Sequence, residues 1–172
     1  MSERFHLSVP VAALVAAIAG GATIAGAWGF ELIAGLEPCP LCLQQRWPYY
    51  AGVPLAIAAL ALGRAGRTRG AGIALAAVAA VMAAGAGLGI YHAGIEWGIW
   101  EGPSACSGGG TIPRDASRLL ESLGEGRIPS CAEASWRFLG LSLAGYNALI
   151  ASALALAAAS GAHGALGRRT AG

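Results

Sequence analysis

The chain has 172 residues, of which 56% are hydrophobic and 12% are charged, and its formal net charge is +2. A soluble domain carries roughly 25% charged residues, and the mean hydropathy here is +0.60. The composition therefore excludes an ordinary soluble globular protein and predicts lipid as the main surrounding medium. No nucleic-acid partner is expected.

Four apolar windows follow one another along the chain. A helix needs about 20 residues to cross about 30 Å of hydrocarbon. We predict such helices at residues 9–34, 47–62, 71–91 and 138–159. The second window is short, so its aromatic residues Trp47, Tyr49 and Tyr50 are expected to extend it into the headgroup region. The predicted fold class is an all-α membrane protein, a single integral domain over residues 1–172 that forms a four-transmembrane-helix bundle.

The first window has an alternative interpretation as a cleaved signal peptide. Arg4 precedes the apolar run, and Ala25-Gly26-Ala27 resembles a cleavage site. The run is longer than the roughly 7–15 residues usual for a signal peptide, and it continues past the candidate cut. We therefore expect the first helix to be retained.

The distribution of arginine predicts the orientation, since the chain has no lysine. Clustered arginines lie near the termini and in the short connection between the second and third windows: Arg4, Arg64, Arg67, Arg69, Arg168 and Arg169. Loops rich in arginine beside membrane helices tend to stay in the cytoplasm. Both termini are therefore expected inside, and the loops at residues 35–46 and 92–137 outside.

All four cysteines of the chain lie in these two outward loops. Cys39 and Cys42 form a Cys-Pro-Leu-Cys motif in the first loop, and Cys106 and Cys131 lie in the second. Disulfides persist outside the cytosol, and thiol–disulfide exchange passes electrons from one pair to another. Two pairs on one face can therefore form a relay to a two-electron acceptor in the membrane, for which a lipid-soluble quinone is suitable. The pairing at rest stays open, because four cysteines allow three complete pairings.

Cys42 is the better candidate for the thiolate nearest this acceptor. A helix N-terminus lowers a thiol pKa, and Arg46 follows four residues later. In a continuous helix, Arg46 would share a face with Cys42 and could stabilise the thiolate and a quinone oxygen. Pro48 weakens this argument, because it also fits the first turn of a helix that starts after Arg46. The alternative for Arg46 is an anchor to phosphate headgroups.

The second outward loop contains a glycine run and a helix-like segment. Residues 107–110 are Ser-Gly-Gly-Gly, a flexible stretch that could present Cys106 to another protein. Leucines then recur at helical spacing, at Leu119, Leu120 and Leu123. We predict a short amphipathic surface helix there, between Cys106 and Cys131.

The chain resembles the disulfide bond formation protein B (DsbB) family, the quinone-linked thiol oxidases of bacterial inner membranes. One motif that carries the resemblance is Glu37-Pro38-Cys39-Pro40-Leu41-Cys42, with Gln45-Arg46 after it. The other is Cys131-Ala132-Glu133, followed by Trp136-Arg137-Phe138-Leu139-Gly140-Leu141. The segment from Tyr91 to Cys106 fits the start of the family's second outward loop. The resemblance covers most of the chain.

The resemblance implies an enzyme that oxidises a periplasmic thioredoxin-fold partner of the DsbA type and passes the electrons to ubiquinone or menaquinone, without a metal. By position, Cys106 is similar to the cysteine that forms the mixed disulfide with the partner, and Cys131 to its resolving mate. Cys39 is similar to the cysteine that exchanges with this loop pair. Cys42 and Arg46 match the positions that contact the quinone. Both cysteine pairs would then face the periplasm.

One departure from the family concerns histidine. The family has a histidine near the end of the third helix, but the surrounding tyrosine and Cys106 align Ala93 with it and place His92 one residue earlier. We therefore expect His92 to be a partly exposed interfacial histidine without a catalytic role. Four tryptophans are expected mainly at the membrane interface, with one or two in a quinone pocket: Trp28, Trp97, Trp100 and Trp136.

Three other functions fit parts of the sequence. Four cysteines could bind zinc, but the long interval from Cys42 to Cys106 argues against it. A structural or transport protein could use disulfides only to staple loops, but transporters usually have ionisable groups within the membrane, and beyond Glu31 at a boundary these windows have almost none. A vitamin K epoxide reductase-like protein also joins four helices to a CxxC motif and quinone. Its motif lies late in the chain, whereas here the motif precedes the second helix.

Overall fold

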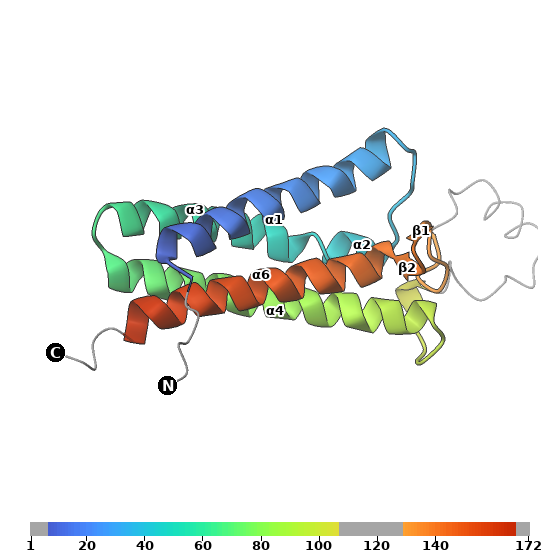
Figure 1. The fold of residues 1–172 in the computed structure, drawn as a ribbon. Coiled ribbons are helices and arrows are strands. Elements are labelled where there is room, and N and C mark those ends of the chain that lie inside the picture. Colours follow the sequence, from blue (N-terminus) through green and yellow to red (C-terminus); the bar gives the residue numbers. More distant parts are fainter. Residues whose placement is uncertain (1–6, 107–128, 168–172) are drawn as a thin grey trace, which may run out of the picture.

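The computed structural model describes residues 7–106 and 129–167. Within these ranges, long helices run side by side as a bundle, and both ends of the described chain lie at the same end of it (Figure 1). The main-chain N–H of Leu7 donates to the hydroxyl of Ser160 at 3.0 Å, which joins the two ends directly. Short elements gather at the opposite end of the bundle (Figure 1).

The long helices are α1 (Val9–Leu32), α3 (Trp47–Arg64), α4 (Thr68–Glu96) and α6 (Leu143–Gly167). The short elements are α2 (Pro40–Gln44), the 3-10 helix η1 (Ser104–Cys106), and the antiparallel strands β1 (Arg137–Phe138) and β2 (Leu141–Ser142). Among the described helices, α1, α4 and α6 are long and apolar enough to cross a membrane. These three helices confirm the prediction of a helical membrane bundle.

Prolines mark where several helices begin. Pro10, Pro40 and Pro48 lie in the first turns of α1, α2 and α3. The first turn of a helix has no internal acceptor for its N–H groups, so a residue without an N–H is tolerated there. The α3–α4 connection turns at Gly66, whose positive φ of 73° is easily reached by glycine.

Small residues let the helices approach closely. A Cβ atom at Gly89 of α4 would lie 2.8 Å from the main-chain nitrogen of Ala148 in α6, so only glycine fits there. Gly87 faces open space instead. Of these two glycines, only Gly89 lies on the α4–α6 contact.

The described residues form two buried clusters. The larger one fills the bundle and contains Leu75, Val78 and Met82 from α4 with many alanines. The smaller one lies at the end with the short elements and contains both cysteine pairs: Cys39, Leu41, Ile95, Cys106 and Cys131, with Cys42 packed against them. This second cluster holds the site.

Among the differences from the predicted spans, two lie beside the site. Helix α4 continues to Glu96, so His92 lies in the helix and not in the second loop. Helix α6 starts at Leu143, because residues 137–142 form a hairpin with Leu139 and Gly140 at its corner, at φ values of 48° and 83°. A left-handed backbone cannot continue a right-handed helix. The predicted amphipathic helix and glycine run lie outside the described residues.

Candidate functional site

The Cys-Pro-Leu-Cys motif forms the start of α2. Cys39 is the N-cap residue, with an extended backbone (φ −71°, ψ 166°). Its sulfur accepts a hydrogen bond from the main-chain N–H of Cys42 at 3.2 Å. This local fold also brings the two Sγ atoms to 2.8 Å from each other.

Cys39 has the lower thiol pKa of this pair. A hydrogen bond from the Cys42 side chain is the largest cause that lowers the pKa of Cys39 to about 5, and hydrogen bonds from His92 and the Cys42 main chain act in the same direction, against burial. The same shared proton raises the pKa of the Cys42 thiol, and burial raises it further. The lower pKa of the pair therefore belongs to Cys39. That Cys42 is the thiolate nearest a membrane acceptor stays a prediction.

The second cysteine pair forms a disulfide that packs against the first pair. Cys106 is bonded to Cys131, and both residues are buried. The sulfurs of Cys131 and Cys39 and a ring nitrogen of His92 lie within 4.8 Å of one another. The structure thus brings together residues from both cysteine-bearing loops. Because two of the thiols are joined, a zinc site of four cysteine thiolates cannot form in this state.

His92 differs from its prediction as a partly exposed interfacial residue. It is 2% exposed, and its Nε2 lies 3.6 Å from the Cys39 sulfur. Its Nδ1 lies 2.7 Å from the Nε2 of Gln45. The exposure prediction is wrong because α4 runs one turn further than expected and carries His92 beneath α2. Glu96, four residues later, has its Oε1 3.9 Å from His92 Nε2.

Arg46 does not share a helical face with Cys42. Helix α2 ends at Gln44, and Arg46 is the N-cap residue of α3. Its guanidinium pairs with the Glu31 carboxylate at 2.7 Å and lies 5.1 Å from the centre of the Trp28 ring. The arginine is 7% exposed, so in this structure it is held by the protein.

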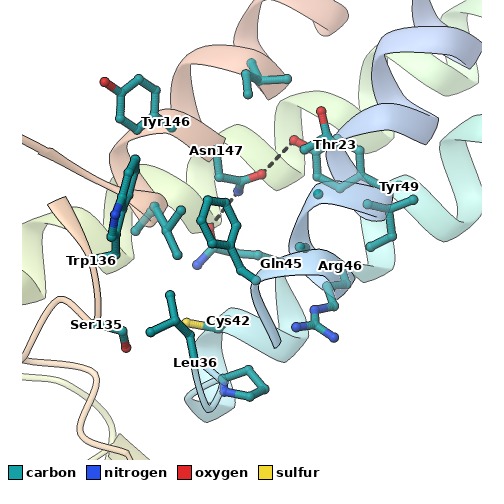
Figure 2. Close-up of a pocket in the computed structure, with 18 of the residues that line it drawn as sticks. Thr23, Leu36, Cys42, Gln45, Arg46, Tyr49, Ser135, Trp136, Tyr146 and Asn147 are labelled. Atoms are coloured by element: carbon teal, nitrogen blue, oxygen red, sulfur yellow. Dashed lines mark hydrogen bonds between the residues drawn. The ribbon is translucent and has the colours of Figure 1, made fainter. Parts of the chain in front are cut away.

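A pocket of about 420 Å³ lies beside Cys42 (Figure 2). Its mainly apolar walls come from α1, α2, α3, α6 and the segment before β1. Cys42 and Arg46 line it, Cys39 does not, and Trp136 is the tryptophan on its wall. Further residues with polar groups on its walls are Thr23, Glu37, Gln45, Tyr49, Ser135, Tyr146 and Asn147. The structure thus places two of the residues proposed for quinone binding on one cavity.

Several residues of the site were not predicted from the sequence. Glu31, Gln45 and Asn147 make polar contacts that join separate helices. Asn147 had a usable signal, because a polar amide inside an apolar window is costly unless it has a partner. Gln45 appears in the family motif without an assigned role. The partner of each could not be identified without the fold.

Comparison with known proteins identifies a family for this chain. The family model "Disulfide bond formation protein DsbB" matches residues 10–161. Disulfide bond formation protein B of Marinobacter nauticus is 34% identical over 140 residues, which cover 76% of this chain and 78% of that protein. The protein of the same name from Aromatoleum aromaticum is 35% identical, over 73% of this chain and 78% of that protein. No solved structure matches the chain. The chain belongs to the disulfide bond formation protein B family, a family of disulfide-generating oxidoreductases, and is a multi-pass membrane protein.

Proposed function

We propose that this protein oxidises the dithiol of a periplasmic DsbA-type partner and passes the electrons to a membrane quinone, as a protein-dithiol:quinone oxidoreductase. The observation that carries the proposal is the position of Cys39. Its sulfur lies within 4.8 Å of the Cys131 sulfur and 2.8 Å from the sulfur of Cys42, which lines the pocket. Family membership supports the same reaction.

The proposed relay consists of thiol–disulfide exchanges. The partner's thiolate attacks Cys106, and Cys131 leaves as a thiolate. Cys131 attacks Cys39 in a Cys39–Cys42 disulfide, and Cys42 leaves with the electron pair. The partner's second thiolate then closes the partner disulfide and releases Cys106, which attacks Cys131 and releases Cys39.

The electrons balance over these exchange steps. The partner loses two electrons and forms one disulfide, and the Cys39–Cys42 pair gains the two electrons. The state expected at its end has a Cys106–Cys131 disulfide with Cys39 and Cys42 free, which is the arrangement described above. Since Cys106 is 3% exposed, the first attack requires a movement that exposes its sulfur.

The pocket fits a quinone by the chemistry of its walls. Its apolar surface suits a ring and tail dissolved in lipid, and Arg46 and the amide groups of Gln45 and Asn147 offer donors for carbonyl oxygens. A quinone bound there would supply the two-electron oxidant. Within the protein, Cys42 is the thiol on the pocket wall, and Cys39 behind it is the sulfur that can reach the loop disulfide.

The proposed topology has four membrane spans in the bacterial inner membrane. The short helix α3 is the second span along the chain and joins the three long apolar helices α1, α4 and α6. Both ends of the described chain and the α3–α4 connection lie at one end of the bundle, and the cysteines lie at the other (Figure 1). Three arginines lie at that connection: Arg64 is the last residue of α3, Arg67 precedes α4, and Arg69 is in the first turn of α4. The positive-inside rule therefore supports cytoplasmic termini and periplasmic cysteines.

The decisive experiment combines purified protein, a reduced DsbA-type partner and either a ubiquinone or a menaquinone analogue, and follows quinone absorbance together with partner thiols. We expect one quinone to be reduced for each partner disulfide formed. Cys106→Ala should abolish oxidation of the partner and retain quinone binding, which can be measured separately by titration. Partner oxidation at the parent rate in that variant, or no quinone reduction in the parent, would refute the proposal.

A further inference from the structure

A chain of polar side chains connects the wall of the pocket to Cys39. The Tyr49 hydroxyl donates to Asn147 Oδ1 at 2.6 Å, and Asn147 Nδ2 donates to Gln45 Oε1 at 2.6 Å (Figure 2). Gln45 Nε2 lies 2.7 Å from His92 Nδ1, and His92 Nε2 lies 3.6 Å from the Cys39 sulfur. The chain joins α3, α6, the end of α2 and α4.

The hydrogen bonds of this chain all run in one direction. A side-chain amide has donors on its nitrogen and acceptors on its oxygen. With Gln45 Oε1 bonded to Asn147 Nδ2, the Gln45 nitrogen faces His92 and can only donate. His92 Nδ1 must therefore accept with its lone pair, which places the proton of the neutral ring on Nε2.

The Nε2–H group of His92 has one acceptor at hydrogen-bonding distance among the side chains described around it. Glu96 Oε1 lies 3.9 Å away, too far for an N–H···O hydrogen bond. The Cys39 sulfur lies 3.6 Å away, within reach of the larger sulfur atom. The main chain of Cys131 also interacts with the ring, so His92 contacts both outward loops.

We propose that His92 is a catalytic residue that donates its Nε2–H to the Cys39 thiolate, and that Tyr49, Asn147 and Gln45 are positioning residues that hold it in this tautomer. The role deepens the proposed function and rests on it. It applies to the step in which Cys106 attacks Cys131. The Cys106–Cys131 bond forms, the Cys131–Cys39 bond breaks, and the electron pair stays on the Cys39 sulfur, with no proton transferred.

Stabilising this sulfur has a direct kinetic effect, because a thiol with a lower pKa leaves faster in exchange. The titratable groups that face Cys39 are Cys42 from α2 and His92 from α4. Glu96 faces His92 from the same helix, and the charge of Arg46 is paired with Glu31. His92 is thus the donor to Cys39 from outside its own helix α2.

The first test reads the tautomer directly. In purified protein labelled with ¹⁵N at histidine, NMR assignment by comparison with His92→Gln should show His92 with a protonated Nε2 and an unprotonated Nδ1. This measurement needs neither partner nor quinone. A protonated Nδ1, in a neutral or a charged ring, would overturn the proposal.

The second test titrates Cys39 in a Cys42→Ser background, where it is the only free thiol and keeps a hydroxyl donor beside it. The ultraviolet absorbance of the thiolate is followed against pH. His92→Phe should lower the thiolate-to-thiol ratio about tenfold, which corresponds to about one pKa unit. Tyr49→Phe should lower it less, about threefold, because Asn147 loses the donor that orients it. A titration of His92→Phe that matches the parent would reject the role of His92.

Matched variants separate this effect from general damage to the fold. Tyr50→Phe removes the neighbouring hydroxyl, which accepts from Trp28 and lies off the chain, and should leave the titration unchanged. His92→Gln keeps an N–H donor that has no tautomer, so adding Tyr49→Phe to it should have no further effect. A Tyr49→Phe effect that persists in that background would show that the chain does not act through His92.

These outcomes are independent of the proposed function. A low thiol pKa that depends on His92, combined with no quinone reduction, would refute the oxidoreductase and leave the hydrogen-bond chain intact. Normal turnover, combined with a Cys39 titration that is unchanged in His92→Phe, would refute the role of His92 and leave the oxidoreductase proposal intact.

Discussion

At the scale of single residues, Arg46 is fixed by its neighbours and still lines the pocket. The Glu31 carboxylate pairs with it at 2.7 Å, and the ring of Trp28 lies beside it at 5.1 Å. A guanidinium has five donors in a planar group, so pairing with one carboxylate leaves donors for another oxygen. Its orientation is therefore set before a ligand binds.

Replacing Arg46 with methionine should raise the apparent KM for quinone more than the apparent KM for the partner protein. A hydrogen bond to a charged group contributes about 1.5–3 kcal/mol, so the apparent KM for quinone should rise roughly 10- to 100-fold. Steady-state titrations of quinone and of partner give the two values separately. Arg64→Met, at the other end of α3, is the control and should change neither. An unchanged KM and rate in Arg46→Met would remove Arg46 from the pocket's function.

Replacing Cys42 with alanine should raise the pKa of Cys39, because the hydrogen bond from Cys42 is the largest cause of its low value. The parent thiolate persists as the pH falls until about 5, and the alanine variant should lose it at higher pH. Cys42→Ser keeps a donor and should stay close to the parent. Titration of thiolate absorbance compares the two variants, and coincident curves would contradict the assigned cause.

At the scale of elements, the contact between α4 and α6 depends on a missing side chain. In lipid, helices associate through close packing of small residues. Gly89 lies against the main chain of Ala148, whereas Gly87 on the same helix faces open space. Glycine is therefore required for helix packing at position 89 but not at position 87, two residues away.

Gly89→Ala should destabilise the bundle by about 1–3 kcal/mol, the usual cost of overpacking a close contact. Gly87→Ala should be neutral or stabilising by about 0.5–1 kcal/mol, because alanine is the better helix former. Thermal unfolding of both variants in the same detergent measures the difference. Equal midpoints would contradict the close contact between Gly89 and Ala148.

At the scale of the whole molecule, the bundle brings distant parts of the chain together at one end. Cys39 precedes α2, His92 lies near the end of α4, and Cys131 follows residues 107–128, yet their reactive atoms lie within 4.8 Å. The larger cluster of buried residues packs the long helices together, and one of them, α4, carries His92. The site is thus a product of the packed bundle.

A protein that retains only Cys39 and Cys131 should form a disulfide between them. The variant is Cys42→Ser combined with Cys106→Ser, and the short distance between the two sulfurs is the reason. Mass spectrometry of non-reduced peptides detects the bond. A variant that retains only Cys42 and Cys106 is the matched control and should form it far less. Free thiols in the first variant after mild oxidation would contradict the relay.

Much of the architecture follows from local patterns. The apolar windows predict the helices, because about 20 apolar residues are stable in a membrane mainly as a helix. The boundaries near His92 and Phe138 were wrong, since a helix end depends on a turn of the chain and on contacts that hydropathy does not report. The hairpin with Leu139 at φ 48° is such a turn.

The sequence by itself determined the membrane bundle, the presence of a CxxC motif and two later cysteines, and the family, since each depends on composition or short motifs. Only the tertiary structure decided which groups meet. The pKa of Cys39 is low because Cys42 and His92 both reach its sulfur, and Arg46 faces Glu31 because α2 ends before it. Such contacts join residues far apart in the chain, and their energies depend on distances of a few ångströms, which no pattern along the sequence contains.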